Sequence, residues 1–325
     1  MRPRGAPLRI GTRSSALAVW QTERVRALLQ ATGHETERIE IKTTGDLTPD
    51  VPLARIGSRA LFTKQIDDAL LEQRIDLAVH SLKDLPTELP PGITIAAVSA
   101  REDARDALVG RDPLRWSDVP RGAVIATSSL RRRAQLLRSR PDLEIVDVRG
   151  NVDTRLAKLD GRPDWTAIVL ATAGLVRLGL AHRIGERLPP EIMLPAPGQG
   201  ALAVTVRVDD TAVRQAVREA IHDAPTAIQV AAERAFLRRL EGGCQVPVAA
   251  YARQGGESEP GLVLHGRVIS LDGQEAVEGH EAGQVYREAE AESLGIALAN
   301  RLLVKGAAPI LTAVRAAVAP LVTEP

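Results

Sequence analysis

Short apolar or alternating runs are separated by amphipathic stretches over the first two thirds of the chain. Runs of this kind predict strands that lie in the core of a sheet. Strands that alternate with helical patterns along a chain predict an α/β fold. The predicted strands cover residues 8–11, 39–41, 75–81, 93–98, 124–127, 144–148, 167–171 and 201–208.

Serine residues mark two helix starts. Ser14 or Ser15 is a suitable N-cap for one helix, which Gly33 ends, and Ser128 or Ser129 caps another. Apolar residues at helical spacing predict which face of each of these helices, and of one further helix, packs against the core. They are Leu17, Trp20, Val25, Leu28 and Leu29, then Phe62, Ile66, Ala69 and Leu70, and finally Leu130, Leu136 and Leu137.

The pattern changes from about residue 223 onward. A helical stretch at 211–222 precedes this point, and a second one at 228–240 is followed by three segments with strand character at 246–253, 262–269 and 275–280. Helices at 289–303 and 309–319 close the chain. This part predicts a small α+β domain, with an antiparallel sheet covered by helices on one face. A length of 325 residues also exceeds what one core usually supports, so two or three domains are expected.

Composition narrows the class of protein. Apolar residues make up 44% of the chain and charged residues 26%, as in soluble globular proteins. Aromatic residues, at 2%, are too few for binding nucleic acid by stacking on its bases. We find no apolar run long enough for a signal peptide or a membrane helix, so we expect a cytoplasmic protein without membrane contact.

Net charge is only +1, but five of the 42 basic residues are lysines and the rest are arginines. Arginines gather where predicted strands run into helices. Because the carboxyl ends of parallel strands lie at one edge of a sheet, these side chains should face one cleft. Arginine binds carboxylates and phosphates bidentately, which predicts a polyanionic ligand. The arginines of the three junctions are Arg131, Arg132, Arg133, Arg138 and Arg140, then Arg149 and Arg155, and finally Arg177.

Two further positions carry candidate chemistry. Asp84 and Lys83 follow the strand at 75–81, and a carboxylate beside a lysine at a strand end is an acid/base candidate. Cys244, the only cysteine, follows two glycines and precedes Pro247, which predicts a loop. Its thiol is either a reactive group or a small buried side chain. The stretch 43–60 lacks a clear period and predicts a lid, a binding loop or disorder.

Seven segments, in their order and spacing, resemble the hydroxymethylbilane synthase (porphobilinogen deaminase) family. They read IGTRSSALAVWQ, HSLKDLPTELP, TSSLRRRAQL, VRGNVDTRL, LATAGLVRLG, PAPGQGAL and LEGGCQVPVAAYA. The resemblance implies two α/β domains like those of periplasmic binding proteins, with the active cleft between them, plus a small C-terminal α+β domain. It implies domain 1 at 1–100 and 200–220, domain 2 at 101–199 and domain 3 at 221–325.

The resemblance also implies an enzyme that deaminates four porphobilinogen molecules and condenses them head to tail. The chain would grow on a dipyrromethane cofactor held through Cys244, and water would release hydroxymethylbilane. Asp84 would be the catalytic carboxylate, stabilising the cation left by loss of ammonia. No metal is implied, and a cytoplasmic monomer is expected. The implied cofactor-binding residues are Cys244, Lys83, Ser81, Thr127, Ser129, Arg131, Arg132 and Arg155; the substrate-binding residues are Arg13, Ser15, Arg149, Arg177, Phe62 and Gln199.

Three positions depart from the family pattern. Asp153 replaces a glycine and adds an acid among arginines, SRALF replaces a KGLF form before the helix at 62, and Thr205 stands where a glutamate is common.

Three other functions compete with this interpretation. A two-lobed carboxylate-binding protein would share the arginines but leaves Asp84 and the cysteine loop unexplained. A thiol hydrolase would need a histidine beside Cys244, for which His80 is a candidate. Nucleic-acid binding fits poorly with the low net charge.

Overall fold

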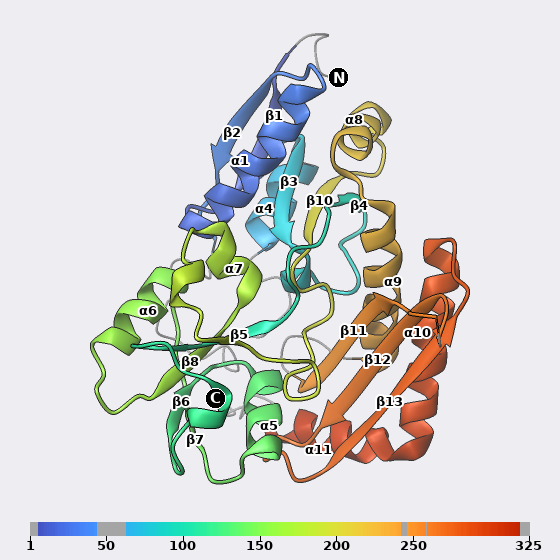
Figure 1. Cartoon of the computed structure of the whole chain (residues 1–325). Coiled ribbons are helices and arrows are strands. Elements are labelled where there is room, and N and C mark those ends of the chain that lie inside the picture. Colours follow the sequence, from blue (N-terminus) through green and yellow to red (C-terminus); the bar gives the residue numbers. More distant parts are fainter. Residues whose placement is uncertain (1–5, 44–62, 242–245, 258, 319–325) are drawn as a thin grey trace, which may run out of the picture. The chain divides into compact units, whose positions relative to one another are not determined.

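The computed structural model describes residues 6–43, 63–241, 246–257 and 259–318. Their contacts divide them into two compact units. The first holds residues up to 43, 63–102 and 200–227, and the second holds 103–199 and 228–318. Figure 1 labels the elements of both.

A five-stranded sheet of order β2-β1-β3-β10-β4 forms the centre of the first unit. Strand β1 is parallel to β2 and β3, whereas β10 is antiparallel to β3 and β4. The chain therefore returns to this sheet after building the second one. The strands are β1 (Leu8–Thr12), β2 (Thr36–Glu40), β3 (Leu77–Ser81), β4 (Ile93–Val98) and β10 (Leu202–Arg207).

Helices cover both faces of this first sheet. Alternation along β3 decides the faces, because Leu77 and Val79 pack with α1 and α8 whereas Ala78 packs with α4. Val25 and Leu29 of α1 are fully buried in the first of these clusters. The helices are α1 (Ala16–Ala31), α4 (Lys64–Leu71) and α8 (Thr211–Ile221), and a 3₁₀ turn, η1 (Leu82–Asp84), follows β3.

The second unit contains another five-stranded sheet, of order β7-β6-β8-β5-β9. Strand β6 is parallel to β7 and β8, and β5 is antiparallel to β8. Leu136 of α5 packs on one face, and α6 and α7 pack on the other. The elements are β5 (Asp106–Gly110), β6 (Val124–Ala126), β7 (Glu144–Val146), β8 (Ala167–Ala171), β9 (Glu186–Arg187), α5 (Leu130–Ser139), α6 (Val152–Asp160), α7 (Thr172–Arg177), η2 (Trp116–Asp118) and η3 (Ala181–Arg183).

An antiparallel sheet of order β11-β12-β13 completes the second unit. Helices pack on one face of it around Phe236, which has no exposed surface. A Cβ at Gly266 of β12 would lie 2.5 Å from the Phe236 ring, so the strand and the ring touch directly. The elements are β11 (Val248–Gln254), β12 (Leu262–Ile269), β13 (Ala276–Gly283), α9 (Ala224–Arg239), α10 (Glu288–Leu302), η4 (Leu303–Ala307) and α11 (Ala308–Val318).

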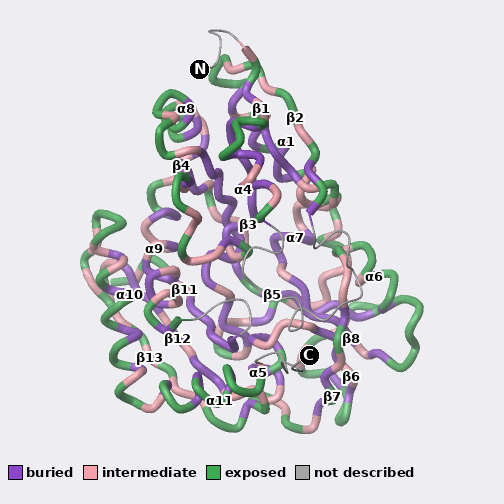
Figure 2. Tube along the Cα trace, turned by 180° about the vertical axis from the view of Figure 1, so that it is seen from behind, coloured by how far each residue is buried: buried purple, intermediate pink, exposed green. Residues whose placement is uncertain are grey.

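The predicted fold class, two α/β sheets with a C-terminal α+β part, is confirmed by these three sheets. In Figure 2 the buried colour gathers along the inner strands, whereas the edge strands β2 and β13 are intermediate or exposed, as are many loops and outer helix turns. Two details differ from the prediction. Strand β9 was not expected, and α1 buries Gln21 and Thr22 whereas Trp20 is 38% exposed. Gln21 on that face donates to Ser81 at the end of β3, a contact that an apolar pattern cannot predict.

The expectation that no segment could span a membrane needs a correction. The stretch Glu288–Val318 is a helix of sufficient length and hydropathy, although only by those two criteria. Gly306, with φ of 110°, interrupts it between α10 and α11. Leu298, Leu302 and Leu311 are buried in the core of the C-terminal sheet, whereas Ile296 and Val304 of the same stretch are exposed.

Candidate active site

The turn after β3 presents Lys83 and Asp84. Leu82 and Leu85 are buried on either side of the pair, and the backbone N–H of Leu82 donates to the Ala201 carbonyl at 3.0 Å. These anchors leave Asp84 exposed and Lys83 half-buried. Because Asp84 is exposed on a short, anchored turn, its carboxylate can contact a ligand without first breaking an interaction in the core.

Ser81, the last residue of β3, is held by a residue that the sequence interpretation missed. Gln21 of α1 is 3% exposed, and its Nε2 donates to the Ser81 hydroxyl at 2.7 Å. Ser15 has a structural task of its own, since it caps α1 by accepting a bond from the Ala18 N–H. Its prediction as an N-cap is confirmed. Arg13 lies half-buried just before this helix.

His80 is buried beside the same turn. Its Nε2 lies 3.1 Å from the Thr205 hydroxyl on the neighbouring strand β10. Burial, and next the charge of Arg13, lower the pKa of His80 to about 4. The ring is therefore neutral at pH 7 and is engaged inside the sheet. This placement gives no support to a thiol hydrolase that uses His80 as its base.

The second unit brings three arginine-bearing junctions to one edge of its sheet, because β7, β6 and β8 are parallel neighbours. Ser128, after β6, forms hydrogen bonds to Val148, after β7, and so links two of the junctions. Its hydroxyl donates to the Val148 carbonyl at 2.8 Å and accepts from the Val148 N–H at 3.1 Å. Sequence reasoning missed this role, for which adjacent serines at a strand end give only a weak signal.

The five arginines of the stretch 131–140 divide into two groups. Arg131 and Arg132 are 6% and 5% exposed, whereas Arg133 and Arg138 are exposed. Arg140 pairs with Asp142 at 2.7 Å near the surface. Only the first two guanidinium groups are therefore built into the interior.

Asp106, at the start of β5, holds both buried arginines. Its Oδ2 accepts from Nη1 of Arg131 at 2.7 Å, and its Oδ1 accepts from Nε and Nη2 of Arg132 at 3.0 and 2.8 Å. Gln199 joins the cluster, since its Nε2 donates to Asp106 Oδ1 at 3.0 Å and to the Ala104 carbonyl at 2.7 Å. Gln199 has no exposed surface, so its predicted contact with substrate remains a prediction.

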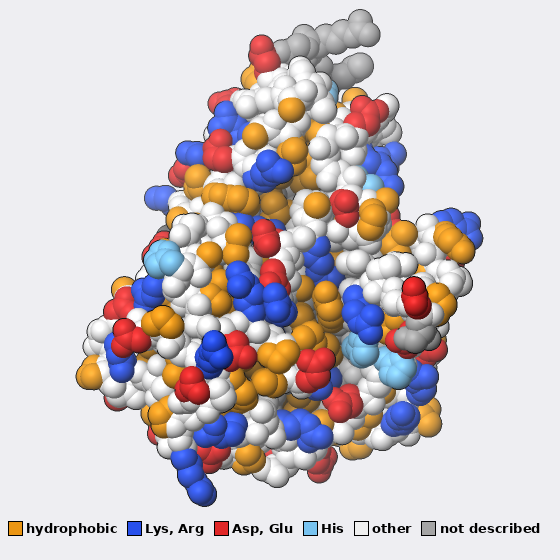
Figure 3. Space-filling view, in the orientation of Figure 1, with side chains coloured by type: hydrophobic (Ala, Val, Ile, Leu, Met, Phe, Trp, Pro, Cys, Tyr) orange, Lys and Arg blue, Asp and Glu red, His pale blue; other side chains and the backbone are white. Residues whose placement is uncertain are grey.

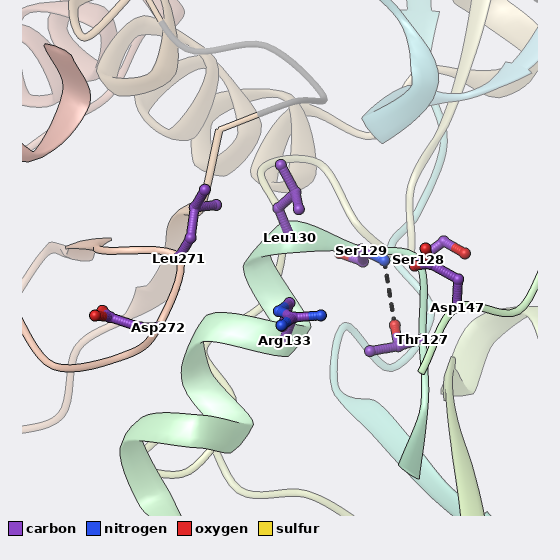
Figure 4. A pocket seen from close by; sticks show the side chains of 8 residues that line it. All are labelled: Thr127, Ser128, Ser129, Leu130, Arg133, Asp147, Leu271 and Asp272. Atoms are coloured by element: carbon purple, nitrogen blue, oxygen red, sulfur yellow. Dashed lines mark hydrogen bonds between the residues drawn. The ribbon is translucent and has the colours of Figure 1, made fainter. Parts of the chain in front are cut away.

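A cavity of about 340 Å³ adjoins the N-terminus of α5. Figure 4 shows Ser129 at the start of the helix, with its N–H donating to the Thr127 hydroxyl at 3.3 Å. Ser129 also caps α5 by accepting from the Arg132 N–H, which confirms one of its two predicted caps. Leu271 and Asp272, from the turn between β12 and β13, line the opposite wall. Hydroxyl residues therefore line this cavity beside α5.

The other two junctions hold the remaining predicted arginines half-buried. Arg155 Nε donates to the Gly150 carbonyl at 2.7 Å, and Lys158 Nζ donates to the Arg149 carbonyl at 3.1 Å. Arg177 is the last residue of α7. Asp153 is exposed at the start of α6. Phe62, Cys244 and most of the stretch 43–60 lie outside the described residues.

Comparisons with known proteins cover nearly the whole chain. Residues 8–215 match the family described as porphobilinogen deaminase, dipyromethane cofactor binding domain, and residues 227–304 match porphobilinogen deaminase, C-terminal domain.

Similar curated proteins carry the same family name. The porphobilinogen deaminase of Desulforudis audaxviator is 52% identical over 94% of this chain and 97% of its own length. That of Geobacter metallireducens is 48% identical over 94% of each. Among solved structures, a periplasmic substrate-binding protein of an ABC transporter from Coxiella burnetii aligns with 70% of this chain and 96% of its own, at 15% identity and a TM-score of 0.43. The chain belongs to the porphobilinogen deaminase family.

Proposed function

We propose that this chain is a hydroxymethylbilane synthase, a transferase of tetrapyrrole biosynthesis. It deaminates four porphobilinogen molecules, condenses them head to tail and releases linear hydroxymethylbilane with ammonia. Family membership supports this function. The structural observation that carries it is the set of three parallel strand ends, each followed by arginine. They adjoin a cavity whose polar lining consists of three hydroxyl residues (Thr127, Ser128 and Ser129), Arg133 and two aspartates.

The residues present fit a dipyrromethane cofactor. Its acetate and propionate side chains are carboxylates, and the site offers guanidinium groups and hydroxyl donors that suit them. The hydrogen bonds of Arg131 use only its Nη1 within the described part of the chain, so its Nε and Nη2 can bind a ligand. When bound through Cys244, dipyrromethane supplies the carbon nucleophile to which the first substrate is joined.

The proposed function also gives roles to the other site residues. We assign the cofactor carboxylates and pyrroles to Ser81, Lys83, Thr127, Ser129, Arg131, Arg132 and Arg155. We assign substrate binding to Arg13, Ser15, Phe62, Arg149, Arg177 and Gln199. Each porphobilinogen brings two carboxylates, which explains why a chain of nearly neutral net charge concentrates arginine at these junctions.

Asp84 is the proposed catalytic carboxylate. Loss of ammonia leaves a cationic methylene-pyrrolenine, and a carboxylate beside the pyrrole nitrogen stabilises that charge where it develops. The same group can accept and return the protons that condensation moves. Its exposed position on the fixed turn η1 supports this role.

We further propose three domains, at 1–100 with 200–220, 101–199 and 221–325, in a cytoplasmic monomer. Three separate sheets support this division. Basic and acidic side chains are interspersed over the face shown in Figure 3, which does not favour a nucleic-acid surface there.

The intact mass of the purified protein tests the function. We expect an excess equal to two linked pyrrole units in the wild type and no excess in Cys244→Ser, because the thioether needs the thiol. Wild-type protein of unmodified mass that binds porphobilinogen but releases no ammonia would instead indicate a non-catalytic carboxylate-binding protein.

A further inference from the structure

The buried cluster around Asp106 has an incomplete charge balance. Two guanidinium groups share one carboxylate, and Asp106 is the only carboxylate that the described part of the chain pairs with either of them. All three side chains are at most 7% exposed. Burying an uncompensated charge is costly, so this cluster favours one further anion.

The hydrogen bonds of Arg131 show where that anion fits. Nη1 donates to Asp106 at 2.7 Å and to the Leu194 carbonyl at 2.8 Å, which fixes the plane of the guanidinium group. The edge formed by Nε and Nη2 makes no hydrogen bond within the described residues. Two parallel N–H groups on one edge are the arrangement that binds a carboxylate bidentately.

Arg132 is held differently. Its Nε and Nη2 both donate to Asp106 Oδ1, and its Nη1 donates to the Val169 carbonyl at 3.0 Å. Arg132 therefore uses its own Nε–Nη2 edge to bind Asp106, whereas the same edge of Arg131 makes no hydrogen bond within the described residues. Gln199 donates to the same oxygen at 3.0 Å. Asp106 is consequently bound from three side chains and has little freedom to move.

We propose that Asp106 is a positioning residue of the active site: it holds Arg131 so that the Nε–Nη2 edge receives a carboxylate of the cofactor. The inference rests on the proposed function for the identity of that carboxylate. Asp106 touches neither substrate nor cofactor in this role and acts through the arginine.

The first sheet offers a matched control. Asp76 is 1% exposed and also lies between two arginines, accepting from Arg9 at 2.8 Å and lying 3.5 Å from Arg207. It belongs to no proposed site. Asp76→Asn and Asp106→Asn each remove one buried carboxylate charge from a comparable setting, so both should lower the thermal unfolding midpoint.

The test compares full-length wild type, D106N and D76N by intact mass and thermal unfolding. We expect D76N to carry the two-pyrrole excess in the wild-type proportion, whereas D106N carries it in a proportion lower by about tenfold or more. D106N with the wild-type proportion would overturn the inference. So would equal losses in D106N and D76N, because stability alone would then explain both. Absence of the excess in the wild type would reject the proposed function instead.

A second variant decides the matter if D106N does not fold. Arg131→Lys keeps a positive charge for Asp106 but lacks the Nε–Nη2 edge. We expect a folded R131K protein with a proportion of the adduct at least about tenfold below that of the wild type. A folded R131K protein with the full two-pyrrole excess would show that this edge is not needed and would overturn the inference.

Discussion

Two buried titratable residues of the first unit, His80 and Asp67, have opposite effects on how the stability of the fold depends on pH. Burial lowers the pKa of His80 to about 4 and raises the pKa of Asp67 to about 6. Asp67 is 4% exposed on α4. Acidification therefore destabilises the folded state by protonating His80, which then carries a buried charge. It stabilises the folded state by neutralising the buried carboxylate of Asp67.

Replacing His80 should change how stability depends on pH. The unfolded chain binds a proton near the ordinary value of 6.5, but the folded chain does so only near pH 4. The stability that neutral His80 provides is complete above pH 6.5 and falls as the pH drops towards 4, by up to about 3 kcal/mol. We expect His80→Gln to lose less stability over this range, as measured by urea unfolding. Asp67 affects both proteins equally, so parallel profiles would contradict the prediction.

Asp84→Asn should keep the cofactor adduct and lose most turnover, by about a hundredfold or more, because an amide cannot stabilise the developing cation. Ammonia release with porphobilinogen measures the effect. Asp118→Asn is the matched control, since Asp118 is an exposed aspartate at the end of another 3₁₀ turn. Near-normal turnover in D84N would remove Asp84 from the mechanism.

The local sequence pattern located the arginine junctions but did not rank their members; only the family resemblance singled out Arg131 and Arg132. Arg131, Arg132 and Arg133 are consecutive and chemically identical, yet only the first two meet Asp106. The difference depends on which helix face turns towards β5, a long-range contact. Asp106 itself looks like an ordinary acid at the start of a strand, so its role appears only in three dimensions.

Among the elements, the turn between β12 and β13 packs unusually closely on α5. A Cβ at Gly273 would lie 2.5 Å from the Arg138 backbone nitrogen and 2.7 Å from the Ala134 carbonyl oxygen. Gly273 also has φ of 75°. Asp272 stabilises the turn, and its bonds from Ser270 and Gln274 lower the pKa of its carboxyl. This contact places Leu271 and Asp272 at the cavity beside Ser129.

Gly273→Ala should separate this turn from α5. Overlap with backbone atoms adds to the cost of the positive φ, so we expect a loss of about 2–4 kcal/mol in the free energy of unfolding. Gly122→Ala is the control: φ is 69° there, but the space around the Cβ is open. It should cost about 1–2 kcal/mol. Equal losses in denaturant unfolding would show that the close contact contributes nothing.

The sequence pattern predicted most elements because their apolar periods are strong. Strands β4 and β8 have the predicted bounds, whereas β6 and β7 end one or two residues earlier than predicted. The two-residue strand β9 has no period to detect, since it pairs with β5 at only two positions. The pairing of β10 with β3 joins distant segments. The family resemblance, not the local pattern, led us to expect that this strand returns to the first domain, but not which strand it pairs with.

At the scale of the whole molecule, the proposed monomer and its proposed cytoplasmic location can both be tested. We expect light scattering to give the mass of one chain, and cell fractionation to recover the protein without detergent. The buried leucines of α10 and α11 pack against the C-terminal sheet. Recovery in the membrane fraction would contradict the cytoplasmic location and would point to the stretch Glu288–Val318.

The position of β10 has a consequence for how the chain folds during synthesis. β10 fills the place between β3 and β4, although about a hundred residues of other structure are made before it. The first sheet therefore stays incomplete, with the facing edges of β3 and β4 unpaired, until the ribosome has released residue 207. Contacts so distant in sequence form slowly. The later-made sheet of β5 to β9 can consequently close first, so the order of folding reverses the usual order from the N-terminus.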